Sequence, residues 1–345
     1  MIGESYQYVL KYDFHDYIYG NMNIAQKKLT TARFKGSAYK LSVVIPCHNE
    51  DAVIADTHSR LYNVLEGLGC AYEMIFVDDG STDETRSVLD ELSVQYANSK
   101  VLALSRNFGH QIAVTAGIDA ADGDAVVLID ADLQDPPEII PDMVERWLTG
   151  VDVVYAVRSR REGETWFKLF SAKLFYRLID ALSETEIPHN AGDFRLMDRK
   201  VKEALSTMPE KSRFVRGMVA WVGYKQEPIF YSRNARVAGE TKYPFKKMIK
   251  FAIDGILSFS TVPLKLATIF GCFISLLSFI GILYSIAMRL FGSQWVPGWT
   301  LMFICILFLG GVQMIFLGLL GEYIGRIYAE SKNRPLYFLE DQGDK

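Results

Sequence analysis

The sequence predicts a doubly wound α/β domain followed by two transmembrane helices. In the first half of the chain, short apolar segments that end in polar residues alternate with amphipathic segments, which is typical of parallel strands joined by helices. No Gly-x-Gly-x-x-Gly motif follows the first apolar segment, which argues against a soluble dinucleotide-dependent dehydrogenase. Near the C-terminus, two long apolar segments contain no charged residue.

The composition is that of an ordinary enzyme with a membrane anchor. The chain has 345 residues, of which 50% are hydrophobic and 23% are charged, and this is too apolar for a disordered chain. A net charge of −4 gives no global reason to expect nucleic acid as a partner. The N-terminus lacks the pattern of a signal peptide, so we expect a chain that faces the cytoplasm. Its cysteines lack metal-binding spacing and are expected to be reduced thiols: Cys47, Cys70, Cys272 and Cys305.

Residues 1–40 form an N-terminal extension that is rich in tyrosine and lysine and has no clear period. Two interpretations remain open. The tyrosines could edge a small hairpin or pack on another subunit, which would make the protein a homo-oligomer. Alternatively, the segment is a poorly ordered extension.

Five strands are predicted from apolar, β-branched runs. They are Leu41–Pro46, Glu73–Val77, Val101–Leu104, Ala125–Ile129 and Val151–Val157. Helices are expected after the first three strands, to about Gly67, after Asp83 and through Ala120. Because open α/β sheets bind ligands at the carboxyl ends of their strands, the polar residues that follow each strand are candidates for a binding site.

The segment Ala125–Pro137 carries the clearest chemical signal. A buried-strand pattern ends in two carboxylates, Asp130 and Asp132, and Gln134 and two prolines follow. Hard oxygen ligands at this position suit Mg²⁺ or Mn²⁺ that carries a substrate diphosphate. A solvated acidic turn is the alternative for an isolated pair of this kind. An EF-hand does not fit, because Asp135 stands where its glycine belongs.

The C-terminal third predicts a membrane-bound protein. At ~1.5 Å per residue, Leu266–Met288 and Thr300–Gly321 can each cross ~30 Å of hydrocarbon. Basic residues flank the pair on both outer sides, whereas the turn between them holds only Arg289, so the positive-inside rule places both termini in the cytoplasm. Two basic amphipathic segments, Trp166–Leu182 and Tyr243–Ser258, favour helices in the membrane interface over core helices of a soluble domain.

These boundaries divide the chain into five parts. They are the N-terminal extension 1–40, a cytoplasmic catalytic domain 41–242, a juxtamembrane amphipathic helix 243–263, a two-helix transmembrane region 264–325 and a cytoplasmic tail 326–345.

Four motifs occur in an order that resembles the polyisoprenyl-phosphate glycosyltransferases of glycosyltransferase family 2. They read Ser-Val-Val-Ile-Pro-Cys-His-Asn-Glu, Val-Asp-Asp-Gly-Ser-Thr-Asp-Glu-Thr, Asp-Ala-Asp-Leu-Gln-Asp-Pro-Pro and Arg-Val-Ala-Gly-Glu-Thr-Lys. With the two spans and the segment His189–Arg199, the chain looks most like the bactoprenol glucosyltransferases, and dolichyl-phosphate mannose synthase is a more distant relative. The resemblance covers about residues 40–335. It implies a GT-A fold and the inverting transfer of a sugar, glucose from UDP-glucose, to a polyisoprenyl (undecaprenyl) phosphate.

The resemblance also implies roles for individual residues. The nucleotide sugar would be held by Pro46, Asn49, Glu50, Asp78, Asp79, Arg106 and Asp130. Within this set, Asp78 would accept a hydrogen bond from the uracil imide, and Asp130 would orient the ribose or the sugar. Asp132 and Gln134 would bind Mg²⁺ or Mn²⁺ together with the diphosphate oxygens.

Four further residues fall at or near the acceptor-phosphate and diphosphate positions of the mannose synthase: Arg158, Lys168, Ser171 and Arg236. Negative charge develops on UDP as it leaves, and a divalent ion and a cation such as Arg236 would stabilise that charge. The nucleophile is an oxygen of a phosphate monoester with a second pKa of ~6, so it needs no strong general base. Asp193 would orient the acceptor or act as a weak base, or else cap a turn or pair with Arg195. The candidate catalytic residues are Asp130, Asp132, Asp193 and Arg236.

Other functions remain to be weighed. A catalytically inactive nucleotide-sugar-binding scaffold would be expected to lose the metal carboxylates, and Asp78, Asp79, Asp130 and Asp132 are all present. A processive polysaccharide synthase would generally carry a Gln-x-x-Arg-Trp motif and more spans, and the sequence has neither. The sugar itself stays open, since N-acetylglucosamine, mannose and aminoarabinose are alternatives to glucose.

Overall fold

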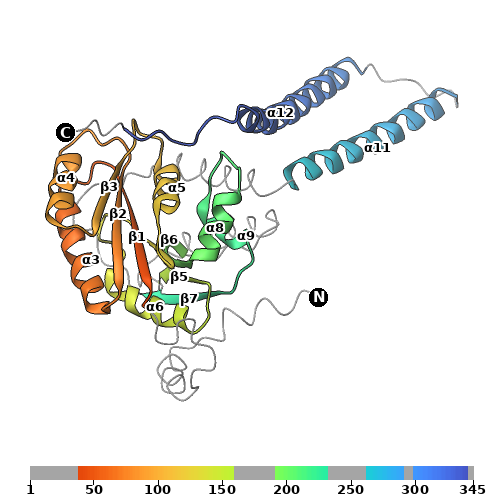
Figure 1. Ribbon diagram of the computed structural model, residues 1–345. Helices are drawn as coiled ribbons and strands as arrows, with labels where there is room; N and C mark the ends of the chain where they lie inside the picture. Colours follow the sequence, from red (N-terminus) through yellow and green to blue (C-terminus); the bar gives the residue numbers. More distant parts are fainter. Residues whose placement is uncertain (1–37, 159–190, 232–261, 291–297, 341–345) are drawn as a thin grey trace, which may run out of the picture.

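Figure 1 shows the computed structural model of the chain, in which two long helices extend from an α/β domain. The structure describes residues 38–158, 191–231, 262–290 and 298–340.

Several parts of the sequence prediction lie outside the described residues. They are most of the N-terminal extension, both predicted interfacial helices, Trp166–Leu182 and Tyr243–Ser258, and the candidate residues Lys168, Ser171 and Arg236.

A single sheet organises the α/β domain, with its strands in the order β3-β2-β1-β4-β6-β5-β7. The strands are β1 Lys40–Cys47, β2 Ala71–Asp78, β3 Ser99–Ala103, β4 Ala125–Leu128, β5 Val153–Arg158, β6 Ala191–Asp198 and β7 Gln226–Tyr231. The first five confirm the predicted strands, with ends that move by at most two residues. In the register of the sheet, Val44 of β1 lies opposite Ile75 of β2 and Leu128 of β4.

The sheet is mixed, which corrects the prediction of a parallel sheet. Strands β1 to β4 are parallel to one another, but β6 runs antiparallel between β4 and β5. Sequence patterns missed β6 because Asp193 and Arg195 interrupt its apolar run, and both residues lie at the site described below. They missed β7 because it contains Pro228, which is tolerated there as β7 lies at the edge of the sheet.

Helices cover both faces of the sheet. Described helices in the domain are α3 Ile54–Leu68, α4 Thr85–Gln95, α5 His110–Ala120, the 3-10 turn η1 Pro137–Ile139, α6 Ile140–Leu148, α8 Arg199–Thr207 and α9 Val215–Trp221. The helices α3, α4 and α5 confirm the three predicted after the first strands. Local signals set several ends: α3 stops at Gly69, which adopts a φ of +64°, and the Asp198 carboxylate caps α8 by accepting from the N–H of Lys200.

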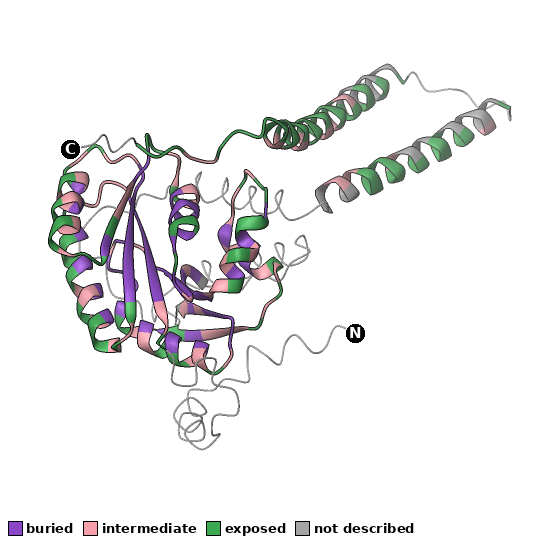
Figure 2. Ribbon diagram, in the orientation of Figure 1, coloured by how far each residue is buried: buried purple, intermediate pink, exposed green. Residues whose placement is uncertain are grey.

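Two apolar cores follow from the alternation of side chains along the strands. Val43 and Ile45 of β1 face the core that packs α3 and α6, whereas Val44 faces the core that packs α5, α8 and α9. The central strands β1, β2 and β4 are buried almost throughout, as Figure 2 shows, whereas the edge strands β3 and β7 are buried only in part. A rigid sheet with filled cores on both sides fixes the loops at its carboxyl edge, where the candidate residues lie.

An ion-pair network around the buried Glu73 carboxylate holds the opposite edge of the sheet. The Glu73 carboxylate accepts hydrogen bonds from Ser42 Oγ and Lys100 Nζ, each at 2.6 Å, and from the N–H of Asp122 at 3.0 Å. Lys40 Nζ lies 3.2 Å from the same carboxylate. Burial alone would raise the pKa of Glu73, but these partners outweigh it and lower the pKa to about 2.

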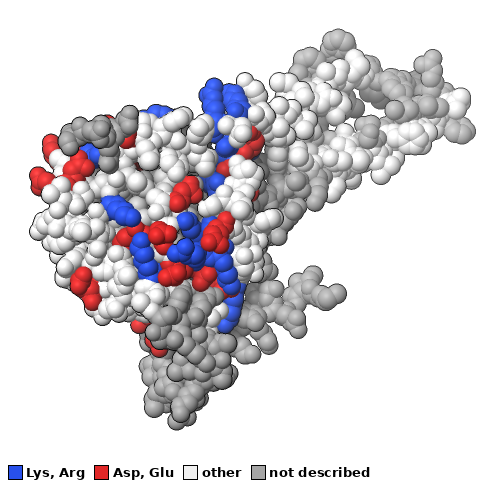
Figure 3. Space-filling view, viewed as in Figure 1, with Lys and Arg blue, Asp and Glu red and all other residues white. Residues whose placement is uncertain are grey.

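The two long helices are α11 Val262–Leu290 and α12 Trp299–Ser331, and they contain both predicted spans. By length and composition, one described segment, Phe308–Ser331, qualifies as a membrane span, and a shorter apolar segment, Ala267–Gly281, lies in α11. Their described side chains are mostly exposed, and Figure 3 shows almost no charge along most of their length. One span therefore has structural support, and the second stays a prediction.

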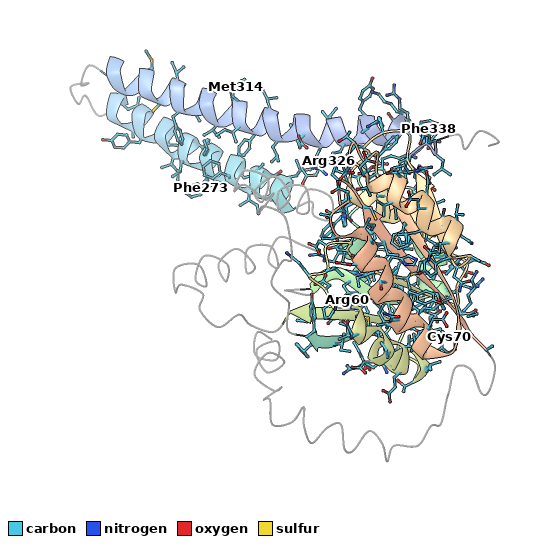
Figure 4. The ribbon with its side chains drawn as sticks, turned by 90° about the vertical axis from the view of Figure 1, so that its left-hand side faces the viewer. Arg60, Cys70, Phe273, Met314, Arg326 and Phe338 are labelled. Atoms are coloured by element: carbon cyan, nitrogen blue, oxygen red, sulfur yellow. The ribbon has the colours of Figure 1, made fainter. Side chains whose placement is uncertain are left out.

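After α12, the chain returns to the α/β domain. Leu339 pairs with Leu104 in an antiparallel bridge just beyond the end of β3, an edge strand of the sheet. Figure 4 shows Phe338 against the α/β domain, beyond the C-terminal end of α12, whereas Met314 lies midway along that helix. Residues 338–340 are thus part of the folded domain.

Candidate active site

The candidate residues gather where the strand order reverses. From β1 the chain moves outward through β2 and β3, and it then returns to place β4 on the other side of β1. Loops after β1 and β4 therefore leave the sheet in different directions, which opens the crevice that α/β sheets use for ligands. Asn49 and Glu50 follow β1, Asp78 ends β2, and Asp130 follows β4.

The loops after β1 and β2 are tied together by side chains. Asn49 adopts a left-handed φ of 56°, and its Oδ1 accepts a hydrogen bond from the N–H of Thr82 at 2.8 Å. The N–H of Asn49 donates to Ser81 Oγ at 3.1 Å, and the N–H of Ser81 donates to Asp78 Oδ1 at 3.0 Å. The N–H of Glu50 donates to Thr85 Oγ1 at 2.8 Å. These bonds hold the two motifs side by side.

Asp79 holds the loop after β3. Its two carboxylate oxygens accept the N–H groups of Phe108 and Gly109 at 2.7 and 2.9 Å. The side chain is buried, and burial raises its pKa although these two bonds oppose the effect. Arg106, in the same loop, lies with its guanidinium carbon 4.0 Å from the centre of the Phe108 ring. The carboxylate thus acts on the backbone that presents Arg106.

Gly80 allows this loop to approach closely. It has a φ of +63°, and a Cβ at this position would meet the carbonyl carbon of Arg106 at 2.5 Å and the nitrogen of Asn107 at 2.6 Å. Only a residue without a side chain fits both the backbone conformation and the space.

The loop after β4 is anchored and strained. Thr57 Oγ1 donates to the carbonyl of Ala131 at 2.7 Å, which fixes the loop to α3. Leu133 adopts a left-handed φ of 58°, a conformation that a bulky side chain rarely takes and that clusters at functional sites. The N–H of Gln134 donates to Asp132 Oδ1 at 3.1 Å, and the Tyr231 hydroxyl donates to Asp135.

A charged cluster joins this loop to three other elements. His110, the first residue of α5, places Nε2 3.2 Å from Asp193 Oδ2 and 3.8 Å from Asp130 Oδ1. Arg216 of α9 places Nη2 3.2 Å from Asp193 Oδ1, and Gln111 Nε2 donates to Asp193 Oδ2 at 3.4 Å. Asp193 comes from β6, so the antiparallel strand delivers the centre of the cluster.

The pKa values of the three titratable residues in this cluster are shifted in different directions. Burial would raise the pKa of Asp193, but the hydrogen bond with His110 and the charge of Arg216 hold it well below its usual range. Burial would lower the pKa of His110, but Asp193 and Asp130 raise it to about 9. Burial, with the neighbouring carboxylates Asp193, Asp135 and Asp132, raises the pKa of Asp130 to about 6, although His110 opposes the shift. Asp193 is an ionised partner of two cations at neutral pH.

Two residues of this cluster, His110 and Arg216, are absent from the sequence prediction. His110 could have been found, since it follows the polar loop at the carboxyl end of β3. Arg216 carries no local signal, because it lies in a short helix far along the chain from the strands of the site. The expected pairing of Asp193 with Arg195 involves the backbone of Asp193, since Arg195 Nε donates to its carbonyl oxygen at 3.2 Å. Burial lowers the pKa of Arg195 to about 10.

The acidic residues that follow β4 have the chemistry for a divalent cation that arrives with its substrate. No group of three metal-ligating side chains occurs within the part of the chain that the structure describes. Mg²⁺ commonly binds through one or two carboxylates together with substrate phosphates, so a complete protein cage is unnecessary. Burial is the largest cause of the raised pKa of Asp130, and repulsion from the neighbouring carboxylates adds to it; a cation would relieve that repulsion. Asp132 and Gln134 therefore fit the predicted metal.

The remaining candidates lie elsewhere in the fold. Pro46 is buried in β1, and Arg158 is the last residue of β5, paired with Tyr231 of β7.

Comparisons with known proteins show to which family the chain belongs. The family model of glycosyl transferase family 2 matches residues 42–205. A bactoprenol glucosyl transferase of Shigella phage SfV is 42% identical over 307 residues, which cover 89% of this chain and 100% of that protein. The chain belongs to glycosyl transferase family 2.

Two bacterial members of the family are also similar over most of their length. The glycosyltransferase YkcC of Bacillus subtilis (strain 168) is 48% identical over 87% of this chain and 93% of its own. The glycosyltransferase sll0501 of Synechocystis is 49% identical over 88% of this chain and 95% of its own. This family membership and the mixed sheet agree with the expected GT-A architecture. The protein is a glycosyltransferase.

Proposed function

We propose that this glycosyltransferase moves glucose from UDP-glucose to a polyisoprenyl phosphate, with inversion, at the cytoplasmic face of a membrane. The observation that supports this proposal most strongly is the 42% identity to a bactoprenol glucosyl transferase over the whole length of that protein. The same chain joins a crevice at the switch point of an α/β sheet to a helix that is apolar enough to cross a membrane. A lipid acceptor accounts for that combination.

The donor occupies the crevice in this proposal. Asp78, at the end of β2, accepts from the uracil imide, and Arg106 lies beside the base and the ribose. Asp79 supports them through the loop that it holds by two backbone hydrogen bonds. Asp132 and Gln134 hold Mg²⁺ or Mn²⁺ with the diphosphate, and the ion supplies positive charge against the departing nucleotide.

The reaction exchanges one bond for another. An oxygen of the lipid phosphate attacks the anomeric carbon, a new C–O bond forms, and the bond from that carbon to the diphosphate breaks with its electron pair on UDP. No strong base is required, because the phosphate is already ionised. The ion-paired Asp193, with its depressed pKa, suits an orienting role better than that of a base.

The membrane topology follows from charge. Both termini are cytoplasmic in the proposal, since basic residues lie before α11 and after the apolar part of α12. A reporter fused at Lys345 should be active in the cytoplasm. Activity of that reporter only on the opposite side of the membrane would contradict this topology.

A donor panel tests the function. The purified enzyme, in detergent with undecaprenyl phosphate and Mg²⁺ or Mn²⁺, is supplied with UDP- and GDP-linked glucose, N-acetylglucosamine, mannose and UDP-aminoarabinose. We expect a glucosyl lipid from UDP-glucose, identified by mass spectrometry. A different sugar on the lipid would correct the donor, and no transfer from any donor would refute the catalytic proposal.

A further inference from the structure

The C-terminal tail makes backbone hydrogen bonds with the chain at the end of β3. The N–H of Glu340 donates to the carbonyl of Ala103 at 2.8 Å, and the N–H of Ser105 donates to the carbonyl of Phe338 at 2.9 Å. Phe338 and Leu339 are 57% and 52% exposed, so burial of these two side chains does not account for the attachment. The tail extends the sheet by one antiparallel bridge next to β3, and no other strand among the described residues pairs with that edge.

Side chains on both sides reinforce this bridge. The Tyr337 hydroxyl donates to Asp119 of α5 at 3.3 Å, and its partly buried ring packs against the core that contains α5. Arg86 of α4 lies 3.7 Å from the Glu340 carboxylate. At the C-terminal end of α12, the Glu330 carboxylate accepts a hydrogen bond from the N–H of Lys211 at 2.7 Å.

The bridged residues lead directly into the donor loop. Ser105, whose N–H is bound by the tail, directly precedes Arg106. Further along the same loop, the N–H groups of Phe108 and Gly109 donate to Asp79. The loop is therefore fixed at both ends, by the tail at its start and by Asp79 at its end. Its middle touches Gly80.

We propose that residues 337–340 are a positioning segment of the donor site, which clamps the loop 104–109 and links the nucleotide pocket to α12. This inference rests on the proposed function, since the loop matters to catalysis only if it holds the nucleotide. The clamp gives α12 a covalent and hydrogen-bonded connection to the site.

A pair of substitutions at one position tests the clamp. Glu340→Pro removes the N–H that donates to Ala103, whereas Glu340→Ala keeps that N–H and loses only the carboxylate. Leu339→Pro is the matched proline control, because in this antiparallel pairing the N–H of Leu339 points away from Leu104. The full-length enzyme is measured in each case, with amide hydrogen exchange of residues 104–109 and the KM for nucleotide sugar and for lipid phosphate.

For Glu340→Pro, we expect faster exchange across 104–109 and an increase of about fivefold in the KM for the nucleotide sugar, with the KM for the lipid unchanged. Glu340→Ala and Leu339→Pro keep both backbone hydrogen bonds, so each should change the two quantities much less than Glu340→Pro does. If Glu340→Pro does not yield folded protein, Tyr337→Ala, which removes the packed ring, should shift both quantities in the same direction.

Wild-type exchange in Glu340→Pro, or an unchanged KM for the nucleotide sugar, would overturn the proposal, as would a change confined to the lipid. Failure of the proposed function is recognisable separately. In that case the wild type transfers no sugar from any donor, while the hydrogen exchange of loop 104–109 still reports whether the tail clamps it.

Discussion

Replacement of Gly80 by alanine should damage the donor site far more than its effect on stability suggests. Gly80 and Gly69 have nearly the same backbone conformation, with φ of +63° and +64°. Alanine at either position costs about 1–2 kcal/mol, because an L-residue is strained in the left-handed region. Gly69→Ala is therefore a matched control for the backbone term.

The two positions differ in what a methyl group would meet. At Gly69 nothing lies within 4 Å, whereas at Gly80 the methyl carbon would lie 2.5 Å from the carbonyl carbon of Arg106. An ordinary carbon–carbon contact needs about 3.5 Å, so the donor loop must retreat by about 1 Å. A misplacement of about 1 Å in a substrate-positioning group can cost about 100-fold in rate.

The assay compares kcat/KM for the nucleotide sugar, together with thermal unfolding, in both variants. We expect a larger loss of stability in Gly80→Ala than in Gly69→Ala, because only the former displaces backbone, and a fall of about 100-fold in kcat/KM for Gly80→Ala alone. Titration of UDP in a calorimeter should show weaker binding to the same variant. Equal catalytic efficiencies in the two variants would refute the assigned contact between Gly80 and the donor loop.

Four further outcomes can be checked. Asp132→Asn should lose metal-dependent transfer by about 10²-fold or more with an unchanged circular dichroism spectrum, and near-normal turnover at ordinary Mg²⁺ would exclude it as a ligand. Arg158→Lys should raise the KM for lipid phosphate and leave UDP binding intact, because lysine lacks the bidentate fork; the reverse pattern would assign it to the donor. Because the pKa of Glu73 is lowered to about 2, its ionised carboxylate stabilises the folded state by about 3 kcal/mol at pH values above its ordinary pKa of 4.5, and this stabilisation is lost as the pH falls towards 2. The guanidinium unfolding midpoint of Glu73→Gln should therefore depend less on pH between about 4.5 and 2 than that of the wild type. Asp193→Asn should bring the pKa of His110 down from about 9 towards its ordinary range in an NMR titration, and an unmoved titration would contradict the ion pair.

The sequence was sufficient for the parts of the fold that local patterns encode. The strands of β1 to β5 are apolar and β-branched runs, and the polar residues that follow β1, β2 and β4 do gather at one edge of the sheet. Family motifs, read by position, located the candidates from Pro46 to Gln134. Their roles stay predictions.

Long-range partners could not be predicted in this way. Asp193 was noted as a candidate, but its bonds to His110 and Arg216 depend on how β6, α5 and α9 pack. The tail was expected only as a cytoplasmic extension, because nothing in Tyr337–Glu340 indicates which strand it joins. Pairing between segments more than two hundred residues apart is decided by the tertiary fold, which local periodicity does not contain.

The position of β6 bears on how the domain is synthesised. This strand lies between β4 and β5, yet it begins at Ala191, long after β4 ends at Leu128. At about 5–20 residues per second, a ribosome leaves that edge of β4 without its native neighbour for roughly 3–13 s. An apolar strand edge exposed for this time can pair with another nascent chain. Co-translational misassembly should therefore begin at β4, and chaperones that shield extended apolar segments should engage the chain before residue 198 has emerged.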